Sequence, residues 1–133
     1  MRGRTATTWW GVVLDAPEPA ALAAFYAELL GWPVTTHDEH GAAIGVPGTT
    51  SYVSIQEATD FVRPEWPASP GRQQMMLHLD VAVDDLDAAV AAALELGATL
   101  AAHQPQDDVR VMLDPAGHPF CLYLDAGDDD PET

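Results

Sequence analysis

The stretch "VDDLDAAVAAALELGATLAAH", residues 83–103, decides the fold because it repeats an earlier part of the chain. It resembles "PEPAALAAFYAELLGWPVTTH", residues 17–37, at an offset of 66 residues. At this offset Gly31 falls on Gly97, and His37 falls on His103. Each copy reads as a strand, a helix, a glycine stop and another strand. The repeat therefore predicts two copies of one structural module.

The first predicted helix has an apolar stripe and clear ends. Its stripe residues recur at i, i+3, i+4 and i+7, and they are Leu22, Phe25, Tyr26 and Leu29. Pro19 suits the first turn of this helix, and Gly31 suits its C-terminal stop.

The second predicted helix begins at Asp84 or Asp85, because aspartate is a favoured N-cap and acidic residues stabilise a first turn. Gly97 ends this helix. Its expected buried stripe consists of Leu86, Val90, Ala93 and Leu94.

Short strands are expected after each helix. In the first half they lie at about 33–37, 42–46 and 51–56, and in the second half at about 99–103, 109–113 and 119–124. Each half thus reads βαβββ. The predicted fold class is α+β, with two βαβββ modules in tandem that form a paired, curved mixed sheet around a cleft.

One domain of 133 residues is expected, since this length suits a single core. Module one spans about 8–57 and module two about 75–125. A surface linker rich in proline joins them over about 58–74, and an acidic tail follows over 126–133.

Composition excludes several classes of partner. A formal net charge of −16 argues against nucleic acid, whose phosphates need a basic surface. No apolar run is long enough for a membrane helix.

The start "MRGRTATTWW" lacks the apolar region of a signal peptide, and the lone Cys121 cannot form an internal disulfide, so a cytoplasmic protein is expected. An acidic surface can attract a cationic ligand, although solubility is the simpler explanation for the charge.

The segment "MMLHLDVAV", residues 75–83, predicts a buried strand that contains two polar side chains. His78 and Asp80 are two residues apart, and a strand places such residues on the same face. Either the pair belongs to a site, or His78 is a core histidine that Asp80 supports by a hydrogen bond.

Three stretches resemble the vicinal oxygen chelate superfamily, which includes glyoxalase I, bleomycin-resistance proteins and extradiol dioxygenases. They are "FYAELLGW" (25–32), "HLDVAVDDLDAAVAAALELGA" (78–98) and "LDPAGHPFCLYL" (113–124). The resemblance covers about residues 10–125 and implies a glyoxalase-like domain protein.

The resemblance also implies where metal ligands would lie. His78 matches the ligand position in the first strand of the second half, but its counterpart in the first half is Gly11, which has no side chain. The late ligand of the second half falls on Cys121, and that of the first half on Ser54 or Gln56. The implied metal set is therefore His78, Gln56 and Cys121, with zinc, nickel, iron or manganese as the ion. Asp80 or Asp15 could substitute for a missing ligand.

Cys121 has further interpretations. Flanked by Phe120 and Leu122, it could be a small buried apolar residue. It could also be a nucleophile with His78 as its base.

Two functions follow from the resemblance. One is a protein that binds a small organic molecule, cationic or aromatic, in the cleft, with a degenerate metal site, as in the bleomycin-resistance branch. The other is a metal-dependent lyase, isomerase or dioxygenase, such as a lactoylglutathione-lyase-like enzyme, with His78 as a ligand. A homodimer is also open, since members of the superfamily often dimerise. The residues expected to line the cleft are His78, Asp80, Tyr52, Gln56, Cys121, Tyr123 and Trp66.

Overall fold

The structure is a computed structural model that describes residues 1–125. The predicted acidic tail, 126–133, lies outside the described residues. The chain divides into two compact units between Phe61 and Val62. The predicted linker therefore contributes most of its length to the second unit, and each unit is described by itself.

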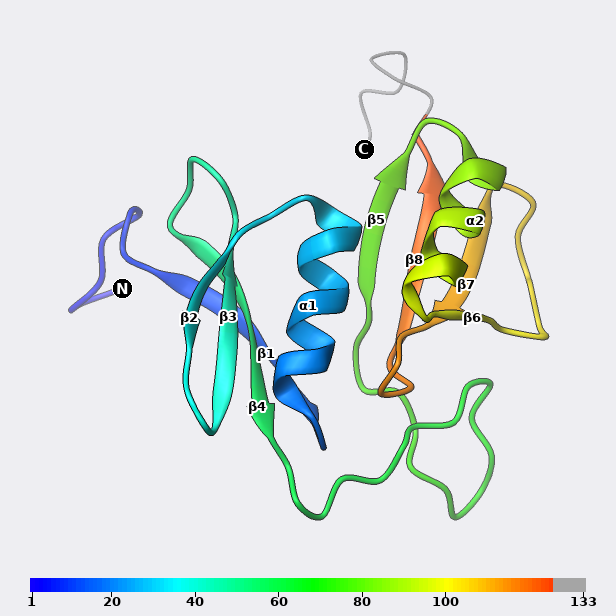
Figure 1. Cartoon of the computed structure of the whole chain (residues 1–133), viewed down its shortest axis with the longest axis horizontal. Helices are drawn as coiled ribbons and strands as arrows, with labels where there is room; N and C mark the ends of the chain where they lie inside the picture. The colour runs from blue at the N-terminus through cyan, green and yellow to red at the C-terminus, as the bar shows by residue number, and fades with distance from the viewer. Residues whose placement is uncertain (126–133) are drawn as a thin grey trace. The chain divides into compact units, whose positions relative to one another are not determined.

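The first unit is a βαβββ module. Its elements are β1 (Trp10–Ala16), α1 (Pro19–Leu30), β2 (Val34–His37), β3 (Gly41–Gly45) and β4 (Ser51–Glu57). The strand order in its sheet is β1-β4-β3-β2. β1 runs parallel to β4, and the other neighbours are antiparallel. Figure 1 shows α1 against one side of this sheet.

The second unit repeats the same topology. Its elements are β5 (Leu79–Val83), α2 (Leu86–Leu96), β6 (Thr99–Leu100), β7 (Val109–Leu113) and β8 (Pro119–Leu124). The strand order is β5-β8-β7-β6, again with a parallel first pair, and α2 packs against β6, β7 and β8 (Figure 1). The predicted fold class, α+β with two βαβββ modules in tandem, is confirmed.

The ends of α1 follow the sequence signals. Pro19 occupies the first turn, where a missing N–H costs nothing. Gly31 ends the helix with φ of 70°, a left-handed conformation that glycine adopts without strain. Of the predicted stripe, Leu22, Phe25 and Tyr26 are buried. They cover the side of the sheet that carries Ile44 and Ile55, both fully buried.

Asp85, one of the two predicted N-caps, caps α2. Its side chain accepts a hydrogen bond from the Ala88 N–H at 3.0 Å. The predicted buried stripe is partly wrong, because Ala93 is buried whereas Leu94 is 45% exposed. Ala93 is the buried residue of the helix, whereas Leu94 lies at the edge of the buried face and stays exposed.

The strand predicted over 75–83 begins only at Leu79. Met76 and Leu77 are 77% and 57% exposed, so the prediction of a buried strand from residue 75 is wrong. The ladder with β8 starts at the pair of Leu79 and Phe120. The preceding residue in β8 is Pro119, which has no N–H to extend the ladder. The predicted strand over 99–103 is also shorter, ending at Leu100.

In both units the helix covers one face of the sheet, and we call the other face the open face, although Val111 on that face of β7 is buried. In β8, Phe120 and Leu122 are 0% and 1% exposed. Cys121 lies between them and points to the opposite face, because side chains alternate along a strand. The open faces carry the predicted site residues of the sheets.

Candidate functional site

Three side chains that can bind a metal meet on the open face of the second unit. Asp80 in β5 and Cys121 in β8 are partners in the parallel ladder. His78 lies immediately before β5 and two residues before Asp80. The strand period and the ladder together bring His78, Asp80 and Cys121 to one place, and we call them the His78 cluster.

The His78 cluster is compact and accessible. His78 Nε2 lies 3.3 Å from a carboxylate oxygen of Asp80. One nitrogen, one oxygen and one sulfur, from His78, Asp80 and Cys121, all lie within 4.8 Å of one another. The side chains of His78 and Asp80 are 37% and 59% exposed, and Cys121 is half-buried. A small ion or ligand can therefore reach all three from solvent.

Burial and the neighbouring Asp80 both affect the protonation of Cys121. Burial raises the pKa of the Cys121 thiol, and the negative charge of Asp80 and a hydrogen bond with Asp80 raise it further. The thiol is therefore protonated at neutral pH, which is the wrong form for a nucleophile. The contact of His78 Nε2 is with Asp80. This arrangement does not favour Cys121 as a nucleophile with His78 as its base. A bound cation would counteract both the charge of Asp80 and its hydrogen bond with the Cys121 thiol.

The first unit has no equivalent ligands at the matching strand positions. Val13 and Asp80 each lie six residues before the first residue of the following helix. The ladder partner of Val13 is Ser54, and that of Asp80 is Cys121. Ser54, rather than Gln56, is thus the counterpart of Cys121.

Gln56 lies two residues further along β4 and has a different partner. Its Nε2 donates a hydrogen bond of 2.7 Å to Asp15, opposite it in β1. The implied ligand set of His78, Gln56 and Cys121 divides between the two units, with Gln56 in the first and His78 and Cys121 together in the second.

Gly11 is the counterpart of His78, and an aromatic ring occupies the space beside it. A Cβ added at Gly11 would lie 2.5 Å from two ring carbons of Tyr52 and 2.6 Å from the Tyr52 carbonyl oxygen. The ring of Trp9 lies 6.4 Å from the Tyr52 ring, and Trp9 is 62% exposed. We call Trp9 and Tyr52 the aromatic pair. No pattern in the sequence joins these two residues, because their contact depends on the register of β1 and β4.

The remaining predicted site residues lie in the second unit. Tyr123 is two residues after Cys121 on the same face of β8, and it is partly exposed. Trp66 is half-buried, with its ring 5.6 Å from the imidazole of His103. Arg63 helps to hold this segment through a 3.2 Å hydrogen bond to the Pro115 carbonyl oxygen.

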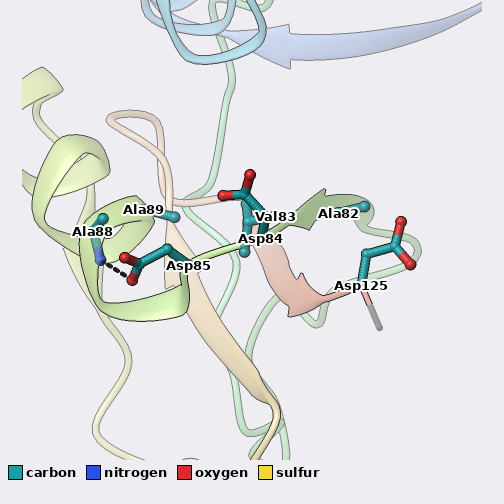
Figure 2. Close-up of a pocket in the computed structure, with 7 residues that line it drawn as sticks. All are labelled: Ala82, Val83, Asp84, Asp85, Ala88, Ala89 and Asp125. Carbon is teal, nitrogen blue, oxygen red and sulfur yellow. Dashed lines mark hydrogen bonds between the residues drawn. The ribbon is translucent and has the colours of Figure 1, made fainter. Parts of the chain in front are cut away.

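A separate hollow with a volume of about 670 Å³ lies where β5 meets α2. Figure 2 shows its lining, which is Ala82, Val83, Asp84, Asp85, Ala88, Ala89 and Asp125. The Asp85 carboxylate turns toward the helix and accepts the Ala88 N–H (Figure 2). None of the predicted site residues lines this hollow, and the sequence indicated only helix capping here.

Comparison with known proteins identifies the family. The family model of the glyoxalase-like domain matches residues 11–123. The chain belongs to the glyoxalase-like domain family. The predicted relationship to the vicinal oxygen chelate superfamily is thereby confirmed. No curated protein matches this glyoxalase-like chain significantly.

Solved structures share the fold of this glyoxalase-like protein at low sequence identity. A glyoxalase/bleomycin resistance protein/dioxygenase family enzyme from Burkholderia phytofirmans has a TM-score of 0.63 at 18% identity, over 86% of this chain and 95% of that one. A glyoxalase-related enzyme from Fulvimarina pelagi has a TM-score of 0.63 at 14% identity, over 92% and 88%. A glyoxalase family protein from Enterococcus faecalis has a TM-score of 0.59 at 19% identity, over 92% and 99%.

Within residues 1–125, neither α1 nor α2 has the length and apolar character that a bilayer crossing requires.

Proposed function

We propose that this glyoxalase-like protein binds a small organic molecule that carries a planar aromatic group and a positive charge. The carrying observation is the Tyr52 ring beside Gly11, where the superfamily resemblance implies a metal ligand. With Trp9 exposed beside it, this position offers a stacking surface instead of a donor atom. The charge of −16 favours cationic ligands.

The test is a ligand panel that pairs planar aromatic cations with neutral molecules of the same shape. Ligands that bind the native state raise the unfolding temperature and quench tryptophan fluorescence. Trp9→Ala is expected to weaken binding about 3- to 10-fold, which is the range of an aromatic pair. Trp10→Ala is the matched control, because Trp10 is the next residue and is similarly exposed, at 57%. The proposal is wrong if no panel member changes either signal.

A second candidate function is a metal-dependent lyase, isomerase or dioxygenase, and the convergence of the His78 cluster favours it. A bound metal would act as a Lewis acid toward a substrate with two vicinal oxygens. Here His78 would be a ligand, with Cys121 or Gln56 as another. Turnover of such substrates by the metal-loaded protein, absent in His78→Ala, would support this function. Equal turnover by the variant would contradict it.

A further inference from the structure

We propose that the open face of the first unit recognises a linear ligand, whose planar aromatic group stacks on the aromatic pair and whose terminal ammonium or guanidinium group binds the Asp15 carboxylate. This inference rests on the proposed function and adds to it a residue that recognises the charge, an orientation and a length. Recognition of the charge is assigned to Asp15, held by Gln56, instead of to the net charge of the whole chain.

Strand period and register place the aromatic pair and Asp15 on one face. Leu14 and Ala16 of β1 are buried on the face that α1 covers, and side chains alternate along a strand. The alternate residues of β1 therefore point to the open face. They are Gly11, Val13 and Asp15, and their ladder partners in β4 are Tyr52, Ser54 and Gln56. The row with Tyr52 and the row with Asp15 are four residues apart, which is about 13 Å along the strands.

A hydrogen bond holds the Asp15 carboxylate in place, although the side chain is exposed. Gln56 Nε2 donates this bond to Asp15 Oδ1 at 2.7 Å, across the β1–β4 ladder. A carboxylate can accept about four hydrogen bonds, so an ammonium group can bind Asp15 while the bond from Gln56 is kept. Asp15 is therefore the contact for the cation, and Gln56 is a positioning residue.

Arg4 determines which end of the face suits a positive charge. Its guanidinium group donates hydrogen bonds of 3.0 Å to the carbonyl oxygens of Thr8 and Trp9, which holds a positive charge close to the backbone of the aromatic pair. Asp15 is the first acidic residue of the chain. A ligand cation is repelled by Arg4 and attracted by Asp15. The charged group is therefore expected on a spacer that leads away from the stacked ring toward Asp15.

The row between the two ends suits an apolar spacer. Val13 is 50% exposed there and offers its methyl groups. Ser54 is half-buried, and its hydroxyl donates a hydrogen bond of 3.3 Å to the Ala42 carbonyl oxygen within the sheet. An alkyl chain across this row covers apolar surface, and its burial stabilises the bound ligand.

The test measures, by isothermal titration calorimetry in chelator at low salt, the binding of naphthalene compounds with a terminal ammonium group on an alkyl spacer. Each amine is paired with the alcohol of the same length, and the ratio of the two affinities is the preference for charge. Spacers with extended lengths below, near and above about 13 Å are compared. The preference is expected to be largest near about 13 Å. A preference that is equal at all lengths, or largest for the shortest spacer, overturns the proposal.

Asp15→Asn removes the charge and keeps the shape and the acceptor for Gln56. It is expected to lower the preference for the amine about 2- to 5-fold, the range of an exposed ion pair, and to leave the affinity of the alcohol unchanged. Glu57→Gln is the matched control, because it removes an equal charge at the next position of β4, on the other face. Equal losses in the two variants would assign the preference to the net charge and overturn the proposal.

Gln56→Ala tests the positioning role. Without the hydrogen bond to Gln56 the Asp15 carboxylate is less firmly held, so the preference for the amine is expected to fall by less than in Asp15→Asn. The affinity of the alcohol should stay the same, whereas a general disturbance of the sheet would weaken both ligands. An unchanged preference, or equal weakening of both ligands, would overturn the role of Gln56.

The outcomes separate this inference from the proposed function. If neither the amines nor the alcohols bind, no ligand stacks on the aromatic pair, and both proposals fail. If both ligands bind and the preference does not depend on Asp15, the proposed function stands and this inference is wrong. The spacer series uses the unaltered chain, so it decides the matter even where a variant fails to fold.

Discussion

A single carboxylate, Asp80, lies within reach of both His78 and Cys121. Its charge and hydrogen bond raise the pKa of the Cys121 thiol in addition to the effect of burial. Asp80→Asn removes the charge, so the pKa of Cys121 is expected to fall. More thiolate is then present at any pH below that pKa, and alkylation by iodoacetamide becomes faster at neutral pH.

This prediction is checked by the alkylation rate as a function of pH in chelator. The midpoint of the rate profile should move to lower pH in Asp80→Asn and stay in place in Asp84→Asn. The second variant removes an equal charge from the same part of the sequence without touching the cluster. An unshifted profile in Asp80→Asn would show that burial alone determines the pKa.

At Gly11 the residue type is determined by its neighbour. Any Cβ there would collide with the ring and the carbonyl oxygen of Tyr52. Gly11→Ala is therefore expected to lower the free energy of unfolding by about 1–3 kcal/mol, as overpacking does, and to weaken ligand binding at the aromatic pair. Denaturant unfolding measures the change. Val13→Ala, on the same face and 50% exposed, should cost less; equal costs would mean that the Tyr52 ring simply moves aside.

At the scale of elements, α2 depends on one cap. Asp85 accepts the Ala88 N–H, which satisfies a donor that has no partner within the helix. Asp85→Ala is expected to lower the free energy of unfolding by about 1 kcal/mol. Asp84→Ala is the matched control for charge, and helix content and denaturant unfolding give the comparison. Equal losses in both variants would assign the effect to charge near the helix N-terminus instead of to the cap.

The elements were predictable where the signal is local. Pro19, Gly31 and Gly97 act on their own turns, so both helices were predicted with their ends. The strand over 75–83 was predicted too long because its length depends on a distant partner. Pro119 in β8 ends the ladder at Leu79, and nothing within 75–83 carries that information. Leu94 was placed in the core because helical spacing does not reveal which flank of a helix the sheet covers.

At the scale of the whole chain, the repeat predicted the two modules, whereas the site depended on register. The strand period placed His78 and Asp80 together from sequence. The addition of Cys121 depends on its pairing with Asp80 in the β5–β8 ladder, and the choice of Ser54 over Gln56 depends on the β1–β4 ladder. Register between strands whose paired residues are 41 positions apart is a tertiary property, because many side chains together determine it.

The net charge of −16 belongs to the whole chain and leads to a prediction about ionic strength. At about 10 mM salt the Debye length is about 30 Å, so most of the acidic surface acts on an approaching cation. At about 1 M salt the Debye length is only about 3 Å. The affinity of a planar aromatic cation is therefore expected to fall about 10-fold or more between these conditions. A neutral molecule of the same shape should bind equally or more tightly at high salt, because salt strengthens apolar burial. Fluorescence titrations at both ionic strengths measure the two affinities. If the cation and its neutral counterpart respond alike to salt, stacking on the aromatic pair determines recognition, and the acidic surface serves solubility alone.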